Sequence, residues 1–346
     1  IDDPESYFQT VIYTGNATAR DITFPGTNDM QPDFVWLKKT DTEVEGHKLF
    51  DSVRGATNLL QTSGTNAEQD QDTSLTSFNS DGFSLGIDSG EIVNDDGVGM
   101  VGWCWKMGTT SGISGTGNLT VNAYSFNSTA KQSVIVYTGN GGSSGTYTHG
   151  LGSAPGFIFG KNRDEAGDGW FAYHHKNTSA PETDYLVFNT NAATADSDGY
   201  WNDTAPTSTL VTVGSAGEVN RAEQQVAYCF AEVQGYSKFG SYTGNNNADG
   251  VFVHLGFRPA MVIIRATDTS NWYMWDNKRS PFNEMNKSLA ANTTAVEETS
   301  REIDFLSNGF KCREARGSHN DTGEFIYMAW AEAPFVNSKG VPNNAR

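Results

Sequence analysis

The chain has 346 residues, enough for two or three domains, and a formal charge of −18 from 41 acidic and 23 basic side chains. An acidic surface repels phosphate groups, which argues against direct nucleic-acid binding. No apolar run reaches the roughly 20 residues that a membrane-spanning helix needs. The 3 cysteines, Cys104, Cys229 and Cys312, are too few for a disulfide scaffold, and Cys104 and Cys229, which lie inside apolar segments, are expected to be buried.

Short apolar runs separated by Gly, Ser, Thr, Asn and Asp predict many short strands and no long helix. The first part of the chain contains five such segments. The second opens with a proline, which suits the first position of a strand, and the fourth contains Asp-Gly, which suits a tight hairpin turn. The segments are residues 13–16 (Tyr-Thr-Gly-Asn), 32–38, 47–51, 80–85 and 100–105.

Residues 108–130 are rich in Gly, Ser, Thr and Asn and are predicted to link two modules. Within them, residues 119–126 alternate apolar and polar side chains, so an extra strand is the alternative to a flexible tether.

The five segments then recur twice, in the same order and at similar spacing. Near-continuous apolar runs after each proline indicate strands buried on both faces or central in a sheet. Residues 289–300 are expected to form a short helix at most. The second set is residues 137–140, 155–161, 170–174, 197–201 and 225–230, and the third is 242–245, 259–265, 272–276, 307–312 and 326–330.

These three copies predict an all-β chain of three tandem antiparallel β-sandwich modules, each with about six or seven short strands in roughly a hundred residues. We place the modules at residues 1–107, 131–233 and 234–346, the last including a C-terminal tail, with the linker at 108–130. Because only Gln234 and Gly235 separate the second module from the third, these two should pack closely.

Polar residues that could carry chemistry differ between the copies. Paired carboxylates such as Asp95 and Asp96 lie in turn-like segments, and no phosphate loop, nucleophile elbow or metal-ligand spacing occurs. Ser-Asp-Gly at residues 80–82 and 197–199 lacks the spaced ligands of a calcium loop and is predicted to form hairpin turns. We therefore expect no enzyme, no catalytic residue, no metal and no cofactor.

Two copies share the spacing Asp-x-x-Arg, in Asp51 with Arg54 and in Asp276 with Arg279. A local ion pair that fixes the turn is the prediction, and contact with a ligand is the alternative. The second copy has His174 and Asn177 at these positions, so no ligand set recurs in all three.

Aromatic side chains, with 8 tryptophans among them, offer flat faces on which sugar rings stack. Most of these rings are expected to fill the sandwich cores. Trp201 and Trp272 border turns and are the best candidates for exposed carbohydrate-binding platforms, and Tyr173 and Trp275 complete the candidate set.

Residues 8–16, 50–55, 234–245 and 331–337, with the C-terminal residues 340–346, carry a resemblance that spans essentially the whole chain. They resemble a protein family common in marine tailed bacteriophages. Its members are described as virion structural proteins, often tail-fibre-like, with jelly-roll or concanavalin-like lectin sandwiches as modules. The resemblance supplies no catalytic residues.

The resemblance implies a non-enzymatic protein on the virion surface, in a tail fibre or similar appendage that contacts host-surface glycans. A capsid-decorating or head-fibre protein is one alternative, and a glycan-cleaving enzyme with two carboxylates in a groove is another. Its partners would be other virion proteins and host glycans, without nucleic acid or membrane insertion. By analogy with phage appendages we expect a homotrimer, and a pseudo-threefold monomer is the alternative.

Overall fold

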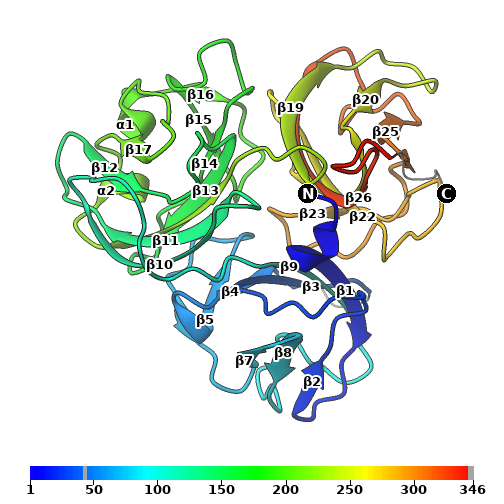
Figure 1. Cartoon of the computed structure of the whole chain (residues 1–346), viewed down its shortest axis with the longest axis horizontal. Helices are drawn as coiled ribbons and strands as arrows, with labels where there is room; N and C mark the ends of the chain where they lie inside the picture. The colour runs from blue at the N-terminus through cyan, green and yellow to red at the C-terminus, as the bar shows by residue number, and fades with distance from the viewer. Residues whose placement is uncertain (42–44, 342–346) are drawn as a thin grey trace.

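A computed structural model describes residues 1–41 and 45–341, and in it three pairs of antiparallel sheets surround a common centre (Figure 1). The chain is nearly all β, as predicted. Residues 342–346, part of the C-terminal segment that carries the resemblance, lie outside the described residues. We call the three sheet pairs, with their connections, modules 1, 2 and 3.

Module 1 follows the short 3₁₀ helix η1 (Pro4–Ser6) and forms the blue lobe of Figure 1. Its larger sheet has the order β1 (Phe8–Thr14), β9 (Gly99–Trp105), β3 (Phe34–Lys39), β4 (Lys48–Asp51), β5 (Gly55–Gln61) and β6 (Gln69–Asp70). Its smaller sheet has the order β2 (Arg20–Ile22), β8 (Gly82–Leu85) and β7 (Leu75–Asn79).

Module 2 is the green lobe, and it contains both α-helices of the described residues, α1 (Asp198–Trp201) and α2 (Gly217–Asn220). Its larger sheet has the order β10 (Thr120–Asn127), β11 (Gln132–Thr138), β18 (Gln224–Phe230), β13 (Phe157–Asn162), β14 (Phe171–His174), β15 (Asp184–Val187) and β16 (Ala195–Asp196). Its smaller sheet pairs β12 (Gly145–Thr148) with β17 (Leu210–Val213).

Module 3 is the yellow-to-red lobe and has the same arrangement of its main strands. Its larger sheet has the order β19 (Ser237–Thr243), β26 (Glu324–Pro334), β21 (Phe257–Ala266), β22 (Tyr273–Asp276) and β23 (Leu289–Ala290). Its smaller sheet has the order β20 (Phe252–His254), β25 (Gly309–Cys312) and β24 (Ile303–Leu306).

Each of the three prolines that recur in the sequence, Pro32, Pro155 and Pro259, lies just before or within a strand that is buried on both faces, which explains the near-continuous apolar sequence of that strand. In β3, Val35 and Leu37 face the smaller sheet of module 1, whereas Phe34 and Trp36 belong to a core that all three modules share. β13 and β21 alternate between their own module's core and the shared core in the same way. Each larger sheet is therefore sandwiched between two apolar layers.

The structure tests the predictions for three connecting segments, residues 108–130, 197–199 and 289–300. The alternating stretch in residues 108–130 forms β10, which pairs along β11, so the second large sheet begins inside the expected linker. The prediction of a hairpin turn at residues 197–199 is wrong: Ser197 instead caps α1, and its Oγ accepts a hydrogen bond from the Gly199 amide at 3.2 Å. In residues 289–300 only β23 and a bridge at Glu298 form.

The Tyr-Thr-Gly-Asn segments turn against a buried asparagine that the sequence did not single out. In module 2, the side-chain oxygen of Asn220 accepts from the Asn140 amide at 2.9 Å, and its amide nitrogen donates to the Gly214 carbonyl at 2.8 Å. A Cβ on Gly139 would lie 2.2 Å from the Arg221 carbonyl oxygen, so only glycine fits this turn. Asn94 and Asn320 make the corresponding contacts in modules 1 and 3.

We expect Asn220→Ala to lower the free energy of unfolding by about 1–3 kcal/mol, because it strands buried backbone groups of the turn without partners. Asn140→Ala is a matched control, since the Asn140 side chain is exposed and bonds only within the same turn. Urea unfolding of both variants checks this. Equal losses in the two variants would contradict the role of Asn220.

Candidate functional site at the module junctions

The four candidate carbohydrate-binding rings are buried. Trp201, Trp272 and Trp275 expose 0% of their surface and Tyr173 exposes 3%, so none can stack on a sugar in this conformation. Trp201 ends α1 and packs edge-on against Tyr173 in the core of module 2. The prediction that these rings form exposed platforms is therefore wrong, because all four pack into the apolar cores.

Both expected ion pairs are present, and each also reaches into another module. In module 1, the Asp51 carboxylate accepts from the Arg54 guanidinium at 2.5 Å and from the Tyr228 hydroxyl, on β18 of module 2, at 2.7 Å. Arg54 also pairs with Glu68 at 2.8 Å. Burial alone would lower the pKa of Arg54, but Asp51, Tyr228 and Glu68 raise it above its usual value.

The same arrangement joins module 3 to module 1. The Asp276 carboxylate accepts from Arg279 at 2.6 Å and from the Trp103 indole N–H, on β9 of module 1, at 3.2 Å. Arg279 in turn pairs with Glu297 at 3.1 Å. These two Asp-x-x-Arg pairs therefore do more than fix a turn, since they bind neighbouring modules together.

The junction between modules 2 and 3 uses neutral groups in equivalent places. His174 stands where Asp51 and Asp276 stand, and its Nε2 donates to the Tyr327 carbonyl of β26 at 3.2 Å. At the position of Tyr228 and Trp103, strand β26 of module 3 has Met328, whose side chain has no N–H or O–H to donate to a carboxylate. Asn177 replaces the arginine, and its oxygen accepts from the Thr194 hydroxyl at 2.8 Å. Loss of the charged pair in module 2 thus follows from its neighbour's side chain.

A second set of equivalent hydrogen bonds runs around the ring in the opposite direction. The Trp170 indole donates from module 2 to the Gln61 carbonyl of module 1 at 2.8 Å. The Trp272 indole donates from module 3 to the Val187 carbonyl of module 2 at 3.3 Å. His47 in module 1 completes the set, with Nε2 at 3.1 Å from the Ala290 carbonyl of module 3.

An aromatic cluster fills the centre where the three modules meet. Trp105 of module 1 lies 4.9 Å from Phe34, 6.0 Å from Phe230 of module 2 and 5.3 Å from Trp330 of module 3, measured between ring centroids. Three backbone bonds reinforce the junctions: the amides of Glu68, Thr194 and Glu297 donate to the carbonyls of Arg163, Thr267 and Thr40. All three modules therefore share one core.

Sequence reasoning did not identify Tyr228, Trp103, Glu68 or Glu297 as partners of the Asp-x-x-Arg pairs. A signal was present in the sequence, since β9 and β18 each carry a side-chain donor, Trp103 and Tyr228, at the position that faces an aspartate. Using this signal requires knowing which modules are neighbours in the ring.

The described residues hold no group of three or more His, Cys, Asp or Glu side chains that could bind a metal ion. The three cysteines are buried, and burial raises the pKa of Cys229 and of Cys312 to about 12, so both are held as thiols. Within residues 1–41 and 45–341, no helix is long and apolar enough to span a membrane.

Fold and contacts together define a closed ring of three antiparallel sheet pairs whose distinctive polar residues join one module to the next. A family model described as "Domain of unknown function (DUF7483)" matches residues 3–334, and the chain belongs to this family. No curated protein matches it.

Proposed function

We propose that the protein is a non-enzymatic structural component of a bacteriophage particle, exposed on the virion surface in a tail fibre or similar appendage or on the capsid exterior. The observation that carries this proposal is that the ion pairs Asp51–Arg54 and Asp276–Arg279 lie buried in the junctions. These residues, for which ligand contact was the alternative, instead bind neighbouring modules of one chain together. The charge of −18 suits a protein that must stay soluble at high local density.

The proposal treats one chain as the threefold unit, in place of the homotrimer expected by analogy. Its support is that the three modules already close a ring around a shared core. Other virion proteins are the proposed partners, and host glycans are the proposed external contact.

Labelling the chain on intact particles tests the location. Antibodies against the purified protein, detected by immunogold electron microscopy on particles of the phage that encodes it, should decorate the tail appendage or the capsid exterior. Label on neither, with the chain absent from purified particles by mass spectrometry, would refute the proposal. Release of reducing sugar ends from polysaccharide by the purified protein would refute its non-enzymatic part.

A further inference from the structure

The junction between modules 3 and 1 contains a buried polar side-chain atom without a partner, in Asn277. Ser52, His175 and Asn277 occupy equivalent positions, each directly after the residue that bonds across a junction. Ser52 donates to the Asp33 carboxylate at 2.7 Å, and His175 Nε2 donates to the Phe239 carbonyl at 2.7 Å. Asn277 is only 8% exposed, and its side-chain oxygen has no hydrogen-bond partner. A buried polar atom of this kind calls for an outside partner.

Facing Asn277 across the junction is a second unpartnered group, the hydroxyl of Thr10 on β1, whose residue is 3% exposed. Thr10 pairs with Trp103 in the sheet, and the residues at the same register in the other modules, Val134 and Phe239, are apolar. Of these three register positions, only that of Thr10 therefore places a polar side chain opposite the residue that follows the junction contact.

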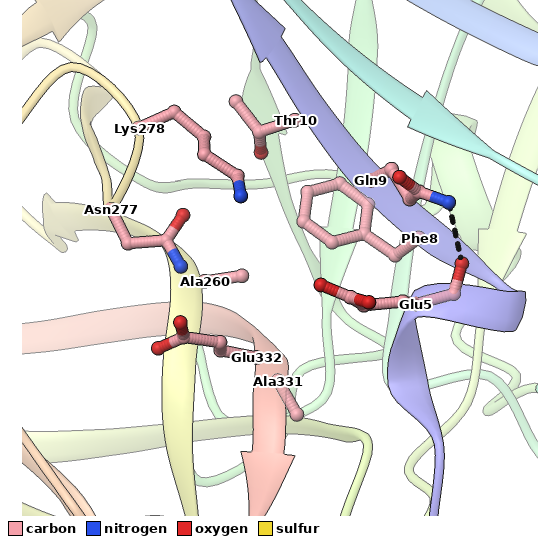
Figure 2. A pocket seen from close by; sticks show the side chains of 9 residues that line it. All are labelled: Glu5, Phe8, Gln9, Thr10, Ala260, Asn277, Lys278, Ala331 and Glu332. Carbon is pink, nitrogen blue, oxygen red and sulfur yellow. Dashed lines mark hydrogen bonds between the residues drawn. The ribbon is translucent and has the colours of Figure 1, made fainter. Parts of the chain in front are cut away.

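These two groups line a small cavity of about 20 Å³, room for one water molecule or one hydroxyl group. Figure 2 shows the Thr10 and Asn277 side chains on either side of the Lys278 ammonium, with the carboxylates of Glu5 and Glu332 below. The cavity offers both hydrogen-bond donors and acceptors.

A larger open cavity of about 390 Å³ shares Asn277, Lys278 and Glu332 with the small one. Phe282 lines this larger cavity and is 82% exposed, the most exposed large hydrophobic side chain among the described residues. Arg258 also lines it and pairs with Glu332 at 2.5 Å. A flat apolar ring thus lies beside fixed polar groups.

The chemistry of the walls favours a neutral saccharide. Positive Arg258 and Lys278 are balanced by negative Glu5 and Glu332, so an isolated phosphate has no excess positive charge to bind. Sugar C–H faces stack on aromatic rings. Sugar hydroxyls donate and accept at once, which matches an amide oxygen and a threonine hydroxyl that both lack partners.

We propose that these two cavities form one saccharide site, with the sugar ring on Phe282 and one of its hydroxyl groups in the small cavity that Thr10, Asn277 and Lys278 line. The inference rests on the proposed function, since it gives a virion surface protein a definite contact with host glycans. It replaces the four buried aromatic candidates with a different platform.

A glycan array probed with the fluorescently labelled full chain tests the site. We expect binding to neutral glycans, weakened about tenfold by Phe282→Ala, which removes the stacking face, and weakened likewise by Asn277→Ala. Both variants should fold, because Phe282 is exposed and the Asn277 side-chain oxygen bonds nothing. Phe252→Ala is the matched control: Phe252 lies in the same module, is 42% exposed and does not line either cavity.

Absence of array binding by the unmodified chain, or binding that Phe282→Ala leaves unchanged, would overturn the site. So would light scattering that shows self-association lost in Phe282→Ala, since the ring would then contact another copy of the chain. Particle labelling remains independent: an unlabelled particle refutes the proposed function whatever the array shows, and a negative array with labelled particles refutes the site alone.

Discussion

Lowering the pH from 7 to 5 is expected to destabilise the fold by about 2 kcal/mol for each of three buried histidines whose folded pKa lies at about 4 or below, roughly 6 kcal/mol in all. The three are His149, His174 and His319, and a fourth buried histidine, His47, acts in the same direction. Burial lowers the pKa of His149 and of His319 to about 4 and the pKa of His174 to about 3, and it holds the pKa of His47 well below its usual value. The expected loss is comparable with the entire stability of many domains.

Hydrogen bonds explain why the rings of His47, His149 and His174 resist protonation. In each, Nδ1 accepts a hydrogen bond: His47 from the Trp36 indole at 2.8 Å, His149 from the Leu151 amide at 3.3 Å and His174 from the Lys176 amide at 3.1 Å. Each Nε2 lies beside a backbone carbonyl, to which it donates. A second proton would set an N–H against an N–H donor and charge a buried ring.

The direction of the change in stability with pH follows from proton uptake. Because the folded pKa lies below the unfolded value of about 6.5, the unfolded chain binds protons that the folded chain cannot, so stability falls as the pH drops from about 6.5 towards 4. The buried Asp33 opposes this trend, since burial raises the pKa of its carboxyl group and acid then favours the folded state.

Urea unfolding at pH 8, 7, 6 and 5 measures the effect. His149→Gln should reduce the slope below pH 6.5 by about 1.4 kcal/mol per pH unit. His254→Gln is the control and should leave the slope unchanged, because His254 is exposed in the fold. A free energy of unfolding that stays flat between pH 7 and 5 would contradict the prediction.

The strands were predictable because their signals are local. A proline before an apolar run, and an Asp-Gly or Asn-Gly pair between two runs, reflect the backbone preferences of a few neighbouring residues. The hairpin prediction failed at Ser197 because Ser-Asp-Gly also suits the start of a helix, where serine caps the first turn. The sequence pattern alone does not decide between these two.

The site was less predictable because its contacts are between distant residues. Asp51 and Tyr228 are 177 positions apart, and Asp276 and Trp103 are 173 apart. Proximity to a turn also said nothing about which way Trp272 points, since that depends on a neighbouring module packing over it. The difference between Asp51, His174 and Asp276 at equivalent positions is explained by the group that each one meets across its junction.

Removing the carboxylate of Asp276 is expected to lower the free energy of unfolding by about 3–5 kcal/mol. Asp276 is fully buried, and Asp276→Ala would leave the Arg279 guanidinium with only Glu297 to balance it. The Trp103 indole N–H would lose its acceptor in the same step. Since these groups join module 3 to module 1, the loss should weaken the closed ring as well as one turn.

Glu298→Ala provides the comparison within the same module. Glu298 also pairs with an arginine three positions away, Arg301, but its side chain is 47% exposed, so we expect a change of at most about 1 kcal/mol. Urea unfolding followed by tryptophan fluorescence measures both variants. If Asp276→Ala costs no more than Glu298→Ala, the Asp276 pair does not hold the junction closed; a large difference would show that the junction depends on it.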